Sequence, residues 1–202
     1  MKQLLLTSAG LSTLTIKQQL LSWISKKSKE CKVAFIPTAA DPEEDKWFVG
    51  ASRQELVECG FQVTDVDLKQ DYKWIKSQLE LADVIYINGG NTFYLLKWIR
   101  KSGVDRYLNN LIENGTIYVG TSAGSLLVGP NIELAAWKKD WDVNNYIPDS
   151  EGLKIVPFEV FPHYEEQYHD LLEQGRKKVN YEIIPLTDKQ GVVVEGKKYK
   201  II

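Results

Sequence analysis

A serine between two glycines is the strongest chemical signal in this sequence. Residues 120–124 read GTSAG, a G-x-S-x-G pattern that follows a strand-like run at 116–120 and opens a helical pattern. A sharp strand-to-helix turn strains the serine backbone and raises its hydroxyl above the sheet. The Ala123 amide would lie at the helix N-terminus, where free N–H groups stabilise developing negative charge. The pattern predicts Ser122 as a nucleophile; a glycine-rich turn with an N-capping serine is the alternative.

A serine nucleophile needs a base, and the chain has 2 histidines, His163 and His169. His163 ends an apolar, strand-like stretch, and Pro162 fixes the backbone before it. His169 lies in a helical pattern among acidic residues, which favours a solvent-exposed position. We therefore expect His163 to be the base. Asp188, in a turn between two apolar runs, is a candidate for the acid that orients it, and an ordinary turn aspartate is the alternative.

A glycine pair provides a second loop for the expected site. Gly89 and Gly90 follow the apolar run 84–87, and glycine lets backbone N–H groups approach a ligand closely. The Gly90 amide would join that of Ala123 as an oxyanion hole, and Asn91 beside it is a candidate for binding substrate. A plain turn is the alternative for this loop. Neither glycine cluster continues into a dinucleotide fingerprint or a phosphate-binding loop.

Strands and helices alternate along the chain in a rhythm that would bring these loops together. The pattern predicts an α/β fold with a mainly parallel sheet flanked by helices on both faces. Ligands bind beyond the carboxyl ends of such strands, so the candidate residues should share one edge of the sheet. The predicted strands are 4–7, 32–36, 61–66, 84–87, 116–120, 182–186 and 191–194, and the predicted helices are 13–26, 42–58 with Asp41 as its N-cap, 72–81, 92–101, 104–113 and 165–178.

Length and composition indicate a single domain over residues 1–202. The chain has 25 Lys and Arg against 27 Asp and Glu, a net charge of −2, so neither nucleic acid nor a membrane surface is an expected partner. The 2 cysteines do not indicate a disulfide scaffold, and no apolar run approaches the roughly 20 residues of a membrane span. We expect a cytoplasmic protein, a monomer or homodimer, that acts on a small molecule or peptide.

Three motifs, in this order, resemble the dipeptidase E and cyanophycinase family of serine peptidases. They are INGGNTF at 87–93, GTSAG at 120–124 and FPHY at 161–164. The resemblance covers nearly the whole chain and implies a flavodoxin-like three-layer sandwich similar to class I glutamine amidotransferase domains, with serine replacing the cysteine nucleophile. It also implies Ser122 as nucleophile, His163 as base and the Gly90 and Ala123 amides as oxyanion hole. No metal or organic cofactor is implied.

The resemblance offers two places for the acid of the triad. Alignment on the family's late strand and turn selects Asp188, whereas an acid shortly after the nucleophile would be Asp140 or Asp142. We expect Asp140 and Asp142 instead to pair with a substrate's free amino group. Solvated loop charges are the alternative for both.

The implied activity is hydrolysis of small peptides, particularly dipeptides, through an acyl-enzyme. The resemblance leaves two preferences open. A preference for an N-terminal aspartate would need a cation beside that side chain; a broader preference for small peptides is favoured by the absence of the arginine-containing insertion that aspartate-specific members have after the histidine. Two alternatives are a cyanophycinase-like β-aspartyl peptidase and a non-catalytic, amidotransferase-like binding or sensor protein.

Overall fold

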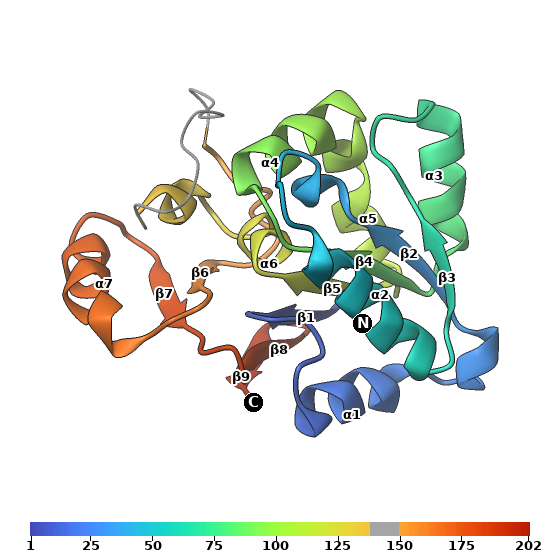
Figure 1. Ribbon diagram of the computed structural model, residues 1–202, viewed down its shortest axis with the longest axis horizontal. Coiled ribbons are helices and arrows are strands. Elements are labelled where there is room, and N and C mark those ends of the chain that lie inside the picture. The colour runs from blue at the N-terminus through green and yellow to red at the C-terminus, as the bar shows by residue number, and fades with distance from the viewer. Residues whose placement is uncertain (138–149) are drawn as a thin grey trace.

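The computed structural model describes residues 1–137 and 150–202. At its centre is a seven-stranded sheet with the strand order β3-β2-β4-β5-β1-β8-β9 (Figure 1). The first five strands in that order are parallel, β8 is antiparallel to β1, and β9 is antiparallel to β8. The predicted mainly parallel sheet is therefore confirmed. The strands are β1 (Gln3–Thr7), β2 (Lys32–Ile36), β3 (Gln62–Asp65), β4 (Val84–Ile87), β5 (Ile117–Thr121), β8 (Gly191–Glu195) and β9 (Lys198–Ile201).

Helices cover both faces of this sheet, which confirms the predicted layers (Figure 1). Successive side chains of a strand point to opposite faces, so Leu5 of β1 packs with the helices of one face while Leu4 and Leu6 pack on the other. Each fully buried aliphatic side chain contributes roughly 1.5–3 kcal/mol. One face carries α1 (Leu14–Trp23) and α2 (Trp47–Glu58); the other carries α3 (Tyr72–Leu81), α4 (Thr92–Lys101), α5 (Leu108–Glu113) and α6 (Ala123–Leu126).

A second, two-stranded sheet positions the loop that contains His163. Strands β6 (Phe158–Phe161) and β7 (Glu182–Pro185) are parallel and are joined through α7 (His169–Arg176). Their pairing continues past β7, since the Leu186 amide donates to the Phe161 carbonyl at 2.9 Å and the Tyr164 amide to the Leu186 carbonyl at 2.9 Å. The predicted strand 182–186 therefore exists, but it belongs to this pair and not to the main sheet.

Four predicted helices are wrong in their bounds. The helix expected over 13–26 ends at Trp23, and the one expected over 165–178 spans only His169–Arg176. The helix expected from Asp41 and Pro42 begins only at Trp47, because the Asp41 carboxylate pairs with Lys69 at 2.6 Å and Asp45 accepts the Trp47 amide at 3.1 Å. The helix expected over 104–113 is divided at Tyr107, whose φ of −133° is not helical. Within the described ranges, no helix combines the length and the apolar character needed to cross a membrane.

Candidate active site

Ser122 stands at the sharp turn between β5 and α6. Its backbone has φ 48° and ψ −107°, a conformation that L-residues rarely adopt. The Ser122 amide donates to the Thr7 carbonyl at 2.9 Å. The Ser125 hydroxyl donates to the carbonyls of Thr7 and Gly120 at 2.8 and 2.7 Å. These bonds tie the turn to β1 and hold the strained serine in place.

The two glycines of the G-x-S-x-G pattern are required by close packing. A Cβ on Gly124 would overlap the Ile87 carbonyl oxygen at the end of β4. A Cβ on Gly120 would stand 2.5 Å from the Gly124 carbonyl oxygen. Glycine at both positions therefore lets β4, β5 and α6 approach closely enough to form the turn.

Three side chains form a hydrogen-bonded line at this turn. His163 Nε2 lies 3.0 Å from Ser122 Oγ, and His163 Nδ1 lies 2.6 Å from Asp188 Oδ1. A carboxylate at Nδ1 holds the proton on that nitrogen and leaves Nε2 able to accept the serine proton. His163, like Ser122, has a positive φ, of 53°. Ser122 is buried, whereas the side chains of His163 and Asp188 are 38% and 61% exposed.

Ser8 forms hydrogen bonds with both His163 and Asp188. It directly follows β1 and is fully buried. Its hydroxyl accepts the His163 backbone amide at 2.7 Å and donates to Asp188 Oδ1 at 2.8 Å. Ser12 in addition donates to the Asp188 carbonyl at 2.6 Å. The loops after β1, β5, β6 and β7 thus meet at one point.

The glycine loop after β4 lies against the serine. A Cβ on Gly89 would stand 3.3 Å from the Ser122 Cβ. Gly90 has φ 130°, and a Cβ there would overlap the Ala39 carbonyl, so glycine is needed for both reasons. Ala123 is the first residue of α6, and its amide has no acceptor within the helix. Of the two candidate oxyanion donors, Ala123 directly follows Ser122 and Gly90 directly follows the glycine that lies against Ser122.

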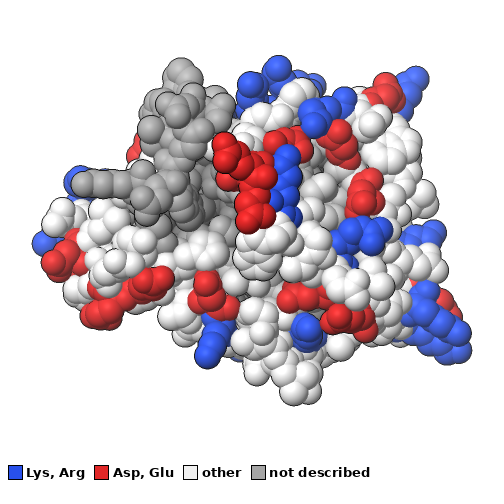
Figure 2. All heavy atoms as spheres, viewed as in Figure 1, with Lys and Arg blue, Asp and Glu red and all other residues white. Residues whose placement is uncertain are grey.

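A cavity of about 580 Å³ opens beside Ser122, and this volume falls in the range of small-molecule sites. Ser122, His163 and Asp188 line one part of it, residues 88–93 line another, and α2 forms the opposite wall. Among the described residues, those that line this cavity include neither lysine nor arginine. On the face of the molecule seen in Figure 2, both charge signs are interspersed.

The remaining predicted site residues have other positions. Asn91 lines the cavity, but its Oδ1 caps α4 by accepting the Tyr94 amide at 2.9 Å. Asp140 and Asp142 lie outside the described residues. His169 is exposed at the start of α7, as expected. Across residues 1–137 and 150–202, no group of three or more His, Cys, Asp and Glu side chains is arranged to hold a metal ion.

Sequence analysis missed three residues of this site: Ser8, Asn88 and Glu55. Ser8 and Asn88 each directly follow a buried strand. Ligands bind at this end of the strands in parallel sheets, so the position of the two residues is the signal that could have found them. Glu55 gave no signal, because a helical glutamate in an amphipathic pattern is ordinarily exposed.

Fold and site together define a class: an α/β protein with the Ser-His-Asp arrangement of serine hydrolases at the carboxyl edge of a parallel sheet. The chain belongs to peptidase family S51, whose model matches residues 4–202. The protein is therefore a serine peptidase.

Relatives with similar sequences are described as peptidases. The chain is similar to an uncharacterized peptidase of Listeria monocytogenes, with 30% identity over 207 residues that cover 98% of this chain and 97% of that protein. It is also 30% identical to peptidase E of a Nostoc species over 150 residues, 73% of this chain and 57% of the Nostoc protein.

Solved structures share the fold. The crystal structure of a candidate peptidase E protein from Listeria monocytogenes superposes with a TM-score of 0.87 over 100% of this chain and 98% of that chain, at 27% identity. A peptidase from an acI-B1 actinobacterium superposes with a TM-score of 0.73 over 100% of this chain and 87% of that chain, at 16% identity, which shows the fold alone.

Proposed function

We propose that this protein hydrolyses short peptides through an acyl-enzyme formed on Ser122, with His163 as the general base and Asp188 as the acid of the triad. One observation carries the proposal: His163 Nε2 lies 3.0 Å from Ser122 Oγ while its Nδ1 lies 2.6 Å from Asp188. Both distances are within hydrogen-bond reach, which is the first requirement for a general base.

In the first half of the reaction, Ser122 Oγ attacks the scissile carbonyl carbon and His163 Nε2 takes the hydroxyl proton. The carbonyl oxygen becomes negatively charged and accepts hydrogen bonds from the Gly90 and Ala123 amides. One such donor typically contributes about 3 kcal/mol to the transition state. The imidazolium, stabilised by Asp188, then protonates the leaving amine nitrogen as the C–N bond breaks.

In the second half, water attacks the ester carbon of the acyl-enzyme. His163 Nε2 takes a proton from this water and returns it to Ser122 Oγ as the ester bond breaks. The carboxylic acid product leaves and the starting state is restored. Every proton in this cycle passes through one imidazole nitrogen.

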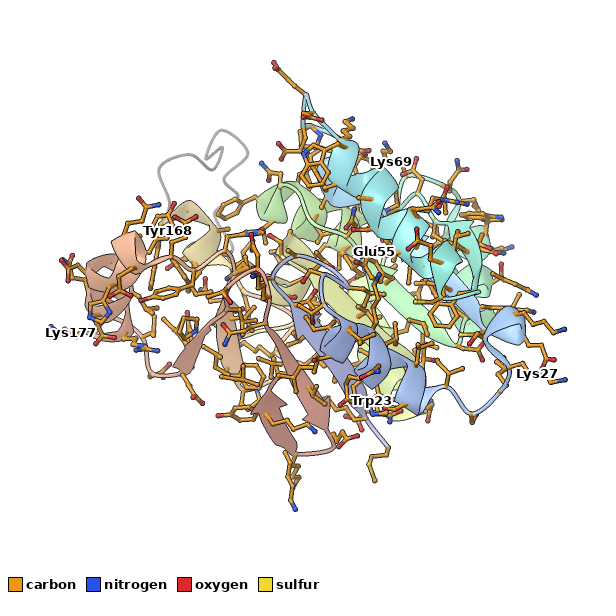
Figure 3. The ribbon with its side chains drawn as sticks, turned by 60° about the horizontal axis from the view of Figure 1, so that its bottom comes forward. Trp23, Lys27, Glu55, Lys69, Tyr168 and Lys177 are labelled. Atoms are coloured by element: carbon orange, nitrogen blue, oxygen red, sulfur yellow. The ribbon has the colours of Figure 1, made fainter. Side chains whose placement is uncertain are left out.

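The cavity supports short peptides with a preference broader than N-terminal aspartate. An aspartate side chain needs a cation, and the described residues that line the cavity provide none. Arg176 instead bonds Glu173 and the Ile183 carbonyl, at 2.6 and 2.8 Å. Lys177 projects at the outer end of the molecule, far from Glu55 (Figure 3).

A fluorophosphonate probe tests the mechanism, because it reacts covalently with an activated serine. We expect intact-mass analysis to show one adduct on the wild-type chain and none on Ser122→Ala or His163→Ala. His169→Ala is the matched control and should be labelled like wild type, since His169 is exposed and does not line the cavity. Labelling of Ser122→Ala would refute the assignment, and an unlabelled wild type would favour the sensor alternative.

A further inference from the structure

The side-chain amide of Asn88 is buried in the wall of the cavity and has no hydrogen-bond partner among residues 1–137 and 150–202. Its side chain is 0% exposed and lines the cavity. Neither Oδ1 nor Nδ2 has a hydrogen-bond partner among the described residues. The Thr92 hydroxyl, on the same loop and also lining the cavity, is likewise buried and unpartnered within the described part of the chain. Because buried polar groups are ordinarily paired, these atoms indicate a ligand that supplies their partners.

Asn88 and α2 line the same cavity. Asn88 directly follows β4, and Ser52 and Glu55 of α2 belong to the same lining. The Tyr86 hydroxyl accepts the Thr121 hydroxyl at 2.8 Å and also bonds Ser52 of α2. Thr121 immediately precedes the nucleophile. A chain of buried hydroxyl groups therefore connects Thr121, the residue before Ser122, through Tyr86 to Ser52 of α2.

The Glu55 carboxylate lies near the Tyr86 hydroxyl in this chain. Glu55 projects inward from α2 (Figure 3) and lines the cavity. Its Oε2 accepts the Leu11 amide at 3.0 Å, and burial raises the pKa of the carboxyl although Lys17 opposes this shift. A Cβ on Gly10 would stand 3.1 Å from the Tyr86 hydroxyl and 3.2 Å from Glu55 Oε2, so these two groups are close neighbours.

Aromatic rings complete the wall on the same helix. Trp47 and Phe48 line the cavity with their rings in edge contact, 6.3 Å between centroids. Trp47 is 72% exposed, although large apolar side chains are usually buried. Trp47 and Phe48 lie two helical turns before Glu55 on α2, about 11 Å along the helix axis at 1.5 Å per residue. A peptide whose basic side chain meets the Glu55 carboxylate could therefore pack its other apolar groups on these rings.

We propose that Asn88 hydrogen-bonds the backbone of the bound peptide and that Glu55 selects a basic side chain next to the scissile bond, while Trp47 and Phe48 pack against another part of the peptide. This inference rests on the proposed peptidase function and adds its substrate class: short peptides that contain lysine or arginine.

Matched dipeptides test the selection. Lysine and norleucine have side chains of similar length that differ in charge, so we compare Lys-Ala with Nle-Ala and Ala-Lys with Ala-Nle. We expect kcat/KM for lysine to exceed that for norleucine by about tenfold or more in one of the two positions, the range of a charge-assisted contact. In Glu55→Gln this ratio should fall to near one. Glu58→Gln, exposed on the same helix and outside the cavity lining, should keep the wild-type ratio.

A free α-amino group is the other cation that Glu55 could meet, and N-acetylated dipeptides distinguish it. Equal rates for lysine and norleucine, with a Glu55-dependent loss of activity on acetylation, would overturn the basic side-chain selection. Equal rates without any effect of Glu55→Gln would overturn it as well. If wild type cleaves no peptide and takes no fluorophosphonate, the proposed function itself fails.

Asn88→Ala tests the hydrogen-bonding role. We expect kcat/KM to fall by about tenfold or more for every peptide, whereas Tm should be unchanged or higher because the substitution removes unpaired buried groups. Asn91→Ala, which removes the α4 cap, should show a lower Tm. A lower Tm in Asn88→Ala with unchanged kcat/KM would mean that the residue is structural and would overturn its role in binding.

Discussion

Backbone strain coincides with the proposed chemistry at the scale of single residues. Ser122 and His163 are two of three non-glycine residues with positive φ in the described chain. Such conformations persist only when surrounding contacts hold them. At Ser122 the contacts come from β1, and at His163 the backbone amide is bound by Ser8. The same residues that the mechanism uses are thus held in place by the loop after β1.

Ser8 should therefore act as a positioning residue. In Ser8→Ala the His163 amide and Asp188 each lose a hydrogen bond, so we expect kcat to fall at least about tenfold through misalignment of the imidazole, with KM little changed. Steady-state kinetics on a cleaved dipeptide measure this. Ser12→Ala is the control, because exposed Ser12 donates to the Asp188 backbone carbonyl and not to its carboxylate, and it should have little effect. An equal loss in both variants would argue against a specific role for Ser8.

Glu159 is predicted to make stability depend on pH. It is fully buried on β6, its Oε2 has no partner among the described residues, and burial raises the pKa of its carboxyl well above the usual value. The folded state keeps the proton at a pH where the unfolded chain has released it, so the free energy of unfolding falls as pH rises above about 4.5. The slope is at most about 1.4 kcal/mol per pH unit.

Glu159→Gln removes this titration and leaves a side chain of nearly the same shape. Urea unfolding at pH 5 and pH 8 should show the variant gaining stability relative to wild type as pH rises. Parallel pH profiles for the two proteins would contradict a neutral Glu159 in the folded state.

At the scale of elements, the close contact of α6 with β4 forms the serine turn. A Cβ on Gly124 would overlap the Ile87 carbonyl, so Gly124→Ala must displace the helix or the strand. We expect the free energy of unfolding to fall by about 1–3 kcal/mol and fluorophosphonate labelling to be lost with the geometry of Ser122. Chemical denaturation and intact mass measure the two effects.

Gly50 provides the matched glycine control. It lies on α2 with nothing within 4 Å of its Cβ position. Gly50→Ala should leave labelling intact and raise stability by about 0.5–1 kcal/mol, because alanine favours the helix. A Gly124→Ala protein as stable and as reactive as Gly50→Ala would show that the turn does not need the close approach.

At the scale of the whole molecule, the central strands of the sheet are buried and the edge strand β9 is exposed. Strands β4 and β5 are buried along their full length, and β1 is buried from Leu4 onward, whereas β9 is exposed at every residue. We expect amides of β1, β4 and β5 to exchange with deuterium only on global unfolding and amides of β9 to exchange by local opening. Hydrogen exchange followed by mass spectrometry measures this order. Equal protection of β9 and β5 would contradict it.

Much of the fold was predictable because local patterns cause it. Continuous apolar runs form strands that are buried on both faces, as for 84–87, which matches β4 in full. The glycines of GTSAG permit one sharp turn, and that turn formed. The predicted helix start at Asp41 was wrong. Asp41 was expected to cap the helix, but its carboxylate pairs instead with Lys69, which is distant in the sequence.

The sequence by itself determined the α/β alternation and the serine turn, since each depends on neighbours along the chain, and it also selected His163, which we propose as the base. Only the tertiary structure decided which other side chains share the site. Ser8 lies 155 residues from His163 in the sequence, yet it bonds both His163 and Asp188. Asn88 and Glu55 became candidates only when burial and a common cavity placed them together. Convergence of this kind follows from strand order and helix packing, which are properties of the folded chain and not of any local segment.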